Sequence, residues 1–281
     1  FSQVLPADEL EAALAADSER PVVHLVARPG EISAEELALI TGGDEGKYSP
    51  YAVYLEGGDP GDIEPVKDGL AAVQDEGSQL IARALVEIPV EGTDAGRWLD
   101  MCAGPGGKAA LIGALARMDR ATVDAVEVSD HRARLIEKSV RGLPVKVHVG
   151  DGRTINLTGG YDRALVDAPC SGLGALRRRP EARWRKQESD IVELNTLQYE
   201  LLESAVNKVR SGGVIVYSTC SPDLRETRGI VDKALGALEI EELEAAEFMP
   251  GMTDTGDEKS VQMWPHRHGT DAMFVAVLRK K

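Results

Sequence analysis

Apolar positions in the second part of the chain follow two alternating spacings. Short apolar runs typical of buried strands occur at Trp98–Met101, Thr122–Val128, Val145–Val149, Arg163–Asp167, Val214–Ser218 and Met273–Leu278. Apolar residues at helical spacing lie between them, at Lys108–Arg117, Arg132–Arg141, Glu188–Arg210 and Glu226–Leu238. Strands that alternate with helices in this way predict an α/β fold, with a mostly parallel sheet and helices on both faces.

The beginning of the chain follows a less regular pattern. It predicts a helix at Pro6–Ala16, a strand at Val22–Ala27, a helix at Ser33–Ile40 and an extended segment at Tyr51–Leu55. Ser33 and Glu36 have the spacing of a capping box at the start of the second helix. We therefore expect a small α+β domain at residues 1–72, followed by a larger domain at residues 73–281.

Composition supports a folded protein, but the charge is unevenly distributed. The chain has 281 residues, of which 43% are hydrophobic, and its net charge is −15. Bulk acidity by itself argues against a nucleic-acid partner, because phosphate binding depends on clustered Lys and Arg. Residues 1–76, however, hold 4 basic and 17 acidic residues, so the rest of the chain is nearly neutral. We therefore do not expect residues 1–76 to be the main phosphate-binding surface, while the second part can bind nucleic acid.

Cysteine usage and hydropathy point to the cytoplasm. The three cysteines, Cys102, Cys170 and Cys220, are too few for a disulfide scaffold, and their spacing fits no zinc pattern. No apolar run is long enough for a membrane span, so we expect neither a metal nor a membrane partner. The chain begins at Phe1, which suggests a piece of a longer protein.

Three successive strands end in residues suited to an adenosyl ligand, and ligands of parallel sheets bind at the carboxyl ends of strands. The first strand runs into Cys102-Ala103-Gly104-Pro105-Gly106-Gly107-Lys108, where glycines allow a ligand to approach the backbone. The next two strands end at Glu127 and Asp151, carboxylates suited to ribose hydroxyls and to the adenine amine. The loop alone could be a tight turn without a ligand. Together the three strand ends favour S-adenosylmethionine over a dinucleotide.

Two further strands end in cysteine loops. Asp167-Ala168-Pro169-Cys170 follows the fourth strand, and Ser218-Thr219-Cys220 follows the fifth. A single cysteine is more often a small buried apolar residue, and the pair could also form a disulfide or bind a metal. Two thiols at neighbouring strand ends beside a cofactor instead indicate nucleophilic chemistry.

These motifs resemble those of a known family. LDMCAGPGGK, VGDGR, DAPCSG and YSTCSP, together with VQDEGSQL at 73–80, are similar to RsmB/Sun-type (Fmu) RNA 5-methylcytosine methyltransferases over roughly residues 73–278. WPHRHGTDAMF at 264–274 resembles the ribosomal-RNA branch, ribosomal RNA small subunit methyltransferase B. The sequence departs from the family after Glu226, where Thr227 and Arg228 replace the usual Glu-Asn.

The resemblance implies a Rossmann-like, S-adenosylmethionine-dependent domain that methylates carbon 5 of a cytosine in RNA and releases S-adenosylhomocysteine. Small-subunit (16S) ribosomal RNA is the favoured substrate. A methyltransferase acting on transfer RNA and a non-catalytic, cofactor-binding RNA adaptor are the alternatives. Family members often carry a further N-terminal RNA-binding domain, and we expect this chain to be a fragment that lacks it.

The resemblance also implies roles for three residues. Carbon 5 of cytosine becomes nucleophilic when a thiolate adds to carbon 6, and a thiolate forms readily only where the pKa of the thiol is lowered. By resemblance, Cys220 is the nucleophile and Cys170 assists breakdown of the adduct and product release. Asp167 hydrogen-bonds the cytosine edge around N3.

A basic segment follows the first of the two cysteines. It surrounds Trp184 and consists of Arg177, Arg178, Arg179, Arg183, Arg185 and Lys186. Such a run could be a solvated loop, but its position close to Cys170 predicts contact with RNA phosphates, along a path for a base turned out of folded RNA. We expect the acidic stretch Glu239–Glu247, in contrast, to be a solvated face.

Overall fold

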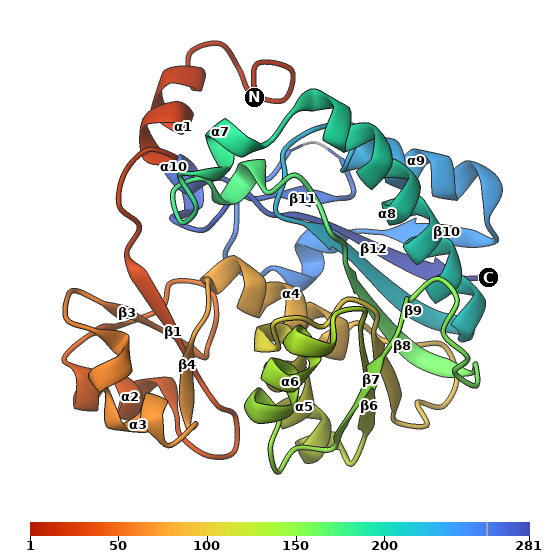
Figure 1. Ribbon diagram of the computed structural model, residues 1–281, viewed down its shortest axis with the longest axis horizontal. Coiled ribbons are helices and arrows are strands. Elements are labelled where there is room, and N and C mark those ends of the chain that lie inside the picture. The colour runs from red at the N-terminus through yellow and green to blue at the C-terminus, as the bar shows by residue number, and fades with distance from the viewer. Residues whose placement is uncertain (257) are drawn as a thin grey trace.

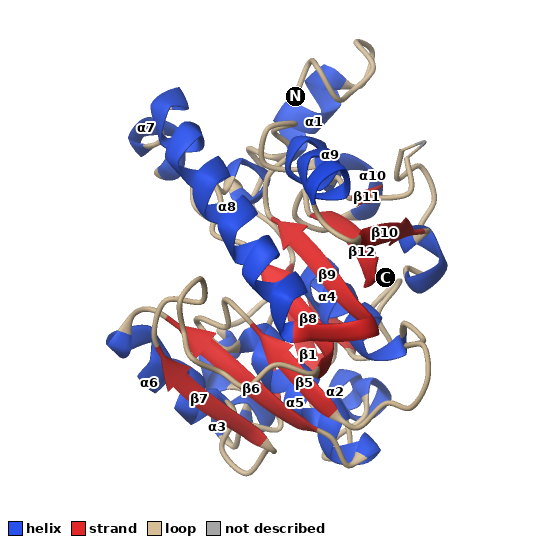
Figure 2. Ribbon diagram, turned by 90° about the vertical axis from the view of Figure 1, so that its right-hand side faces the viewer, coloured by secondary structure: helices blue, strands red, loops and turns tan. Residues whose placement is uncertain are grey.

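The computed structural model describes residues 1–256 and 258–281, and its centre is an eight-stranded sheet (Figure 2). Seven of the strands have the order β10-β12-β9-β8-β5-β6-β7, and the eighth, β11, pairs with β12. Five neighbours are parallel: β5 (Arg97–Asp100), β6 (Thr122–Glu127), β7 (Val145–Val149), β8 (Tyr161–Asp167) and β9 (Val209–Thr219). The antiparallel edge consists of β12 (Phe274–Lys280), β10 (Ile240–Leu243) and the short β11 (Val261–Gln262). The predicted mostly parallel α/β sheet is confirmed.

Helices cover both faces of this sheet, because successive residues of each strand point to opposite sides. On β9, Val214 and Val216 pack in one apolar cluster with α4 (Glu76–Glu87) and α5 (Gly107–Asp119). Ile215 and Tyr217 pack in the other cluster with α8 (Glu188–Lys208) and α9 (Arg228–Ala237). The remaining helices are α6 (Asp130–Ser139), which packs against α5, and the short η2 (Leu173–Ala175), α7 (Ala182–Arg185), η3 (Ala245–Phe248) and α10 (Pro265–His268).

A second, four-stranded sheet with the order β2-β3-β1-β4 lies beside the larger one (Figure 1). Its strands are β1 (Val23–Ala27), β2 (Asp44–Glu45), β3 (Ala52–Leu55) and β4 (Ala71–Val73), and its helices are α2 (Ala34–Thr41), η1 (Pro60–Asp62) and α3 (Glu64–Lys67). The capping box of Ser33 and Glu36 is present at the start of α2. Leu25, Leu37 and Val53 form part of its separate core.

The first seventeen residues pack on the larger unit. In α1 (Leu10–Ala16), Ala13 joins Leu5 in an apolar cluster with Trp264 and Ala272, next to α10. The chain therefore starts on the larger unit before it enters the small sheet, and β4 spans the division expected at residue 72. That division stays a prediction.

Two elements differ from the sequence-based expectation. The apolar residues of α4, such as Leu80 and Leu85, are fully buried, although the pattern did not predict this helix. The acidic stretch at 239–247 contains strand β10 at the sheet edge, which the pattern did not predict; Ile240 is buried against the core, while four of the five glutamates are exposed, as expected of a solvated face. No helix of the described residues is long and apolar enough to cross a membrane.

Candidate active site

Two cysteine loops leave the sheet side by side. Asp167 at the end of β8 lies opposite Ser218 of the parallel strand β9, so the segments that follow them emerge at the same sheet edge. Cys170 and Cys220 lie in these segments, and their Sγ atoms are 3.4 Å apart. Both are free thiols. The structure thus brings together two side chains that are fifty residues apart in the sequence.

The two thiols differ in how readily they ionise. A hydrogen bond from Cys170 lowers the pKa of Cys220, and the nearby Lys108 ammonium lowers it further, although burial and Asp167 oppose them. The same hydrogen bond, together with burial, raises the pKa of Cys170. Since the thiolate is the nucleophilic form, Cys220 is the better nucleophile of the pair.

Asp167 joins this centre through both of its oxygens. Lys108 Nζ donates to Asp167 Oδ2 at 2.8 Å and to Ser78 Oγ at 3.2 Å. Ser218 Oγ donates to Asp167 Oδ1 at 2.8 Å. Burial disfavours the charge of Lys108, but the Asp167 carboxylate outweighs it and raises the pKa of Lys108. Lys108, expected only in the glycine loop, therefore also reaches the predicted catalytic residues, and Ser78 and Ser218 were not predicted.

Glu226 links the two cysteine loops through a network of hydrogen bonds. Its fully buried carboxylate accepts hydrogen bonds from Ser171 N at 2.8 Å, from Ser171 Oγ at 2.5 Å and from Gln198 Nε2 at 3.1 Å. Ser171 Oγ in turn lies 3.2 Å from Ser221 Oγ. Ser171 follows Cys170 and Ser221 follows Cys220, so this network fixes the positions of the two thiols relative to each other. Its only sequence signal was the partial family motif at Glu226.

The glycine loop between β5 and α5 lies at the point where the strand order reverses. A side chain at Gly104 would place its Cβ 2.1 Å from Glu127 Oε2, so any larger residue there would displace the Glu127 carboxylate. Gly106 has a φ of +115°, which also favours glycine. Glu127 at the end of β6 is buried and lies 3.5 Å from Arg132. The loop and the carboxylate thus lie against each other at the place where parallel sheets bind ligands.

Residues 83–279 match the family model described as 16S rRNA methyltransferase RsmB/F. The chain belongs to this family. Its cofactor is therefore S-adenosylmethionine, the ligand class that the strand ends predicted.

Relatives and solved structures agree with this assignment. The chain is 58% identical over 273 residues to Rv1407 of Mycobacterium tuberculosis, a match that covers 97% of this chain and 60% of that protein. It is 34% identical to the ribosomal RNA small subunit methyltransferase B of Cronobacter sakazakii, covering 97% of this chain and 63% of that one. The chain thus spans about three fifths of the length of these relatives.

Among solved structures, PH0851 superimposes with a TM-score of 0.89 at 27% identity, over 99% of this chain and 64% of that chain. NSun6 from Pyrococcus horikoshii with SFG superimposes with a TM-score of 0.83 at 20% identity, over 99% of this chain and 96% of that chain. This second likeness concerns the fold alone.

Unpaired polar atoms in this RsmB/F protein suit the methionine part of the cofactor. Asp100 Oδ2 and both amide atoms of Gln74 are buried without a hydrogen-bond partner among the described residues. Burial and the neighbouring Asp167 raise the pKa of Asp100 to about 7. The Gln74 amide lies beside Gly107, 3.6 Å from where a Cβ there would be. Buried polar groups normally have partners, so these atoms fit a ligand with an ammonium and a carboxylate group.

The other predicted cofactor residues are placed as follows. Cys102 packs against the apolar cluster under α8, and burial raises the pKa of its thiol. Ala103, at the start of the loop, is buried next to α6, and Pro105 follows Gly104 through a cis peptide bond. Both oxygens of Asp151 accept hydrogen bonds from Arg153, which also pairs with Glu200. The contact of Asp151 with adenine stays a prediction. Within the described ranges, no cluster of three His, Cys, Asp or Glu side chains is arranged to hold a metal ion.

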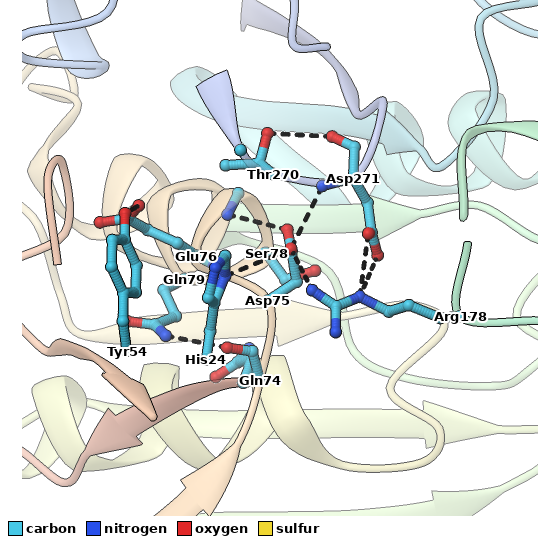
Figure 3. A network of polar contacts seen from close by, with 12 residues as sticks. His24, Tyr54, Gln74, Asp75, Glu76, Ser78, Gln79, Arg178, Thr270 and Asp271 are labelled. Atoms are coloured by element: carbon cyan, nitrogen blue, oxygen red, sulfur yellow. Dashed lines mark hydrogen bonds and ion pairs between the residues drawn. The ribbon is translucent and has the colours of Figure 1, made fainter. Parts of the chain in front are cut away.

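The structure divides the basic segment after Cys170, and it corrects the prediction for the first two arginines. Arg178 Nε lies 2.9 Å from both carboxylate oxygens of Asp271, and Arg178 Nη2 lies 2.7 Å from Asp75 Oδ1 (Figure 3). Arg177 Nε donates to the same Asp271 at 2.8 Å. Asp75 also lies 3.5 Å from His24 of the small sheet. Arg177 and Arg178 thus neutralise two buried carboxylates and are not free for RNA phosphates.

The rest of the segment remains at the surface. Arg183 donates to the backbone oxygen of Asp17 at 2.6 Å and to Ser18 Oγ at 3.1 Å, which ties α7 to the start of the chain. Arg179, Arg185 and Lys186 are exposed and form no ion pair with any described residue. Trp184 beside them is 88% exposed. Only this part of the segment can contact phosphates, and its role in RNA binding stays a prediction.

The hydrogen bond between the thiols makes the reactivity of Cys220 depend on Cys170. In Cys170→Ala we expect the alkylation of Cys220 by iodoacetamide to shift to higher pH, because the thiolate loses the donor that lowers its pKa. Mass spectrometry of the Cys220 peptide across a pH series measures the shift. Cys102→Ala removes a thiol outside this pair and should leave the profile unchanged. An unchanged profile in Cys170→Ala would contradict the assignment of Cys220 as the stabilised thiolate.

Proposed function

We propose that this chain transfers a methyl group from S-adenosylmethionine to carbon 5 of a cytosine in RNA through a covalent adduct with Cys220. The observation that carries the proposal is the thiol pair at the ends of β8 and β9, in which Cys220 has a lowered pKa. Family membership supports RNA methylation, and relatives named as ribosomal RNA small subunit methyltransferase B favour 16S ribosomal RNA as the substrate.

The bound cofactor supplies the methyl group on an electrophilic sulfonium. Cys220 adds as a thiolate to carbon 6 of the cytosine, and carbon 5 then has the electron density to take the methyl group. Asp167, fixed by Lys108 and Ser218, is placed to hydrogen-bond the cytosine edge around N3 and to stabilise the addition.

Release of the product completes the reaction. After methylation, carbon 5 gives its proton to a solvent water, the electron pair of that bond forms the double bond between carbons 5 and 6, and the bond between Cys220 and carbon 6 breaks, which restores the aromatic ring. Cys170, whose raised pKa keeps it protonated, lies 3.4 Å from Cys220 and can donate a proton to the departing thiolate. This placement supports a role for Cys170 in breakdown of the adduct.

We also propose a role for each domain: residues 73–281 carry out the chemistry, and residues 1–72 are an accessory unit.

Bisulfite sequencing of total RNA tests both the base and the substrate. In cells that lack this protein, we expect one cytosine of 16S ribosomal RNA to lose its protection from conversion. Re-expression of the wild-type protein should restore the protection, whereas expression of Cys220→Ala should not. Loss of protection in transfer RNA would identify the other substrate class. No change in any RNA would contradict a carbon-5 methyltransferase.

A further inference from the structure

A cleft with basic residues at its rim separates the small sheet from the methyltransferase unit. It has a volume of about 600 Å³, and its lining residues come from β4 and α3 on one side and from α5 and the end of α6 on the other. Its lining includes the apolar residues Ala71, Val73, Ala110 and Leu111. Gly107 of the glycine loop is among its lining residues, and the next residue, Lys108, contacts Asp167, so the cleft lies close to the active site.

The cleft is lined by basic residues, although one of its walls belongs to a segment that is acidic overall. Residues 1–76 contain only four cations, yet two of them, Arg28 and Lys67, line the cleft. Lys138 and Arg141 at the end of α6 face them from the other wall, and Asp68 is the only acidic residue in the lining. The folded chain thus gathers cations from two distant segments around one hollow, although the first segment is strongly acidic overall.

These cations are largely free to bind an anion. Arg28, Lys138 and Arg141 form no ion pair within residues 1–256 and 258–281, whereas Lys67 Nζ donates to the backbone oxygen of exposed Asp62 at 2.9 Å and lies 3.9 Å from its carboxylate. Arg28 is partly buried, and its guanidinium donates to Ser139 O at 3.0 Å across the cleft. A partly buried cation without a carboxylate partner favours an anionic ligand at this place.

The backbone next to the cations offers further hydrogen bonds. In the strand order β2-β3-β1-β4, β4 is an edge strand, so its outer edge has no partner strand in the described structure. Val73 on this strand is 51% exposed. An unpaired strand edge, apolar lining residues and four cations suit unpaired bases joined by phosphates. An added peptide strand would use the edge equally well, but the four cations favour a polyanion.

We propose that this cleft binds the RNA strand next to the target cytosine, with Arg28, Lys67, Lys138 and Arg141 at its phosphates. The inference rests on the proposed function, because it requires an RNA substrate in the active site. The expectation that residues 1–76 are not the main phosphate-binding surface is unchanged by it, because this segment supplies two of the four cations. In this arrangement the small unit places Arg28 and Lys67 next to the RNA strand.

A matched pair of double variants tests the proposal. Lys67→Glu/Lys138→Glu reverses one cation on each wall, and Arg20→Glu/Lys146→Glu makes the same charge change at exposed residues outside the cleft. The probe is a fluorescein-labelled single-stranded RNA containing cytosine, titrated by anisotropy at several salt concentrations. For the cleft variant we expect affinity to fall about tenfold and the salt slope to decrease by about 1.4, as for two lost phosphate contacts. The control should bind within about twofold of the wild type.

Further measurements separate the outcomes. RNA labelled with 4-thiouridine should crosslink to residues 66–73 or 138–141 of the wild type. If the wild type methylates RNA but the cleft variant binds like the wild type, or the crosslinks lie elsewhere, the cleft proposal is wrong and the proposed function stands. If the wild type methylates no RNA, the proposed function itself fails. If the cleft variant melts at a lower temperature than the wild type, the double variant Lys138→Glu/Arg141→Glu replaces it in the same test, because both residues are exposed on one wall of the cleft.

Discussion

Cys220→Ala is expected to abolish both methyl transfer and the covalent complex with RNA, whereas Cys170→Ala is expected to accumulate that complex. Loss of the nucleophile removes the only route to the adduct, so the rate should fall by at least about 10⁴-fold. Loss of Cys170 leaves the nucleophile but removes the thiol 3.4 Å away that assists its departure. A denaturing gel of labelled RNA incubated with each variant and S-adenosylmethionine shows the complex as a shifted band.

Two controls make this comparison decisive. Both variants should bind S-adenosylhomocysteine like the wild type in calorimetry, because neither thiol is part of the glycine loop or Glu127. Both should also melt close to the wild-type temperature. A stable complex in Cys220→Ala and none in Cys170→Ala would reverse the roles of the two cysteines.

Arg178→Ala is expected to lower the free energy of unfolding by about 3 kcal/mol, because it removes one of two cations that neutralise the buried Asp75 and Asp271. This loss of stability is small for the removal of one partner of a buried ion pair, because Arg177 still contacts both carboxylates. Urea denaturation followed by tryptophan fluorescence measures it.

The neighbouring Arg179 provides the matched control. It is exposed and forms no ion pair in the described part of the chain, so Arg179→Ala should change the free energy of unfolding by less than about 0.5 kcal/mol. Equal stability of the two variants would show that the network in Figure 3 contributes little to stability. RNA affinity should be compared only in variants that remain folded, which makes Arg179 a better probe of phosphate contacts than Arg178.

The local pattern of the sequence predicted most of the larger sheet. Residues such as Val145–Val149 and Glu188–Lys208 form the expected strand and helix, since periods of two and of 3.6 residues depend only on near neighbours. The helix at Glu76–Glu87 was missed because its first residues belong to a motif, at 73–80, that was interpreted only for its resemblance, and the apolar residues that follow at helical spacing were not considered. The glycine loop and the two cysteine loops were found because parallel strands bring their carboxyl ends to one edge.

By itself, then, the sequence determined the fold class, the cofactor and the cysteines that carry the candidate chemistry. Only the tertiary structure decided which charges are free. Arg178 and Asp75 are 103 residues apart in sequence yet 2.7 Å apart in space, and Lys67 and Lys138 face one cleft from separate units. Electrostatic interaction depends on distance and burial, which no local pattern records. The uneven distribution of the net charge of −15 could be counted along the sequence, whereas the ion pairs that engage Arg177 and Arg178 could not be inferred from the basic segment after Cys170.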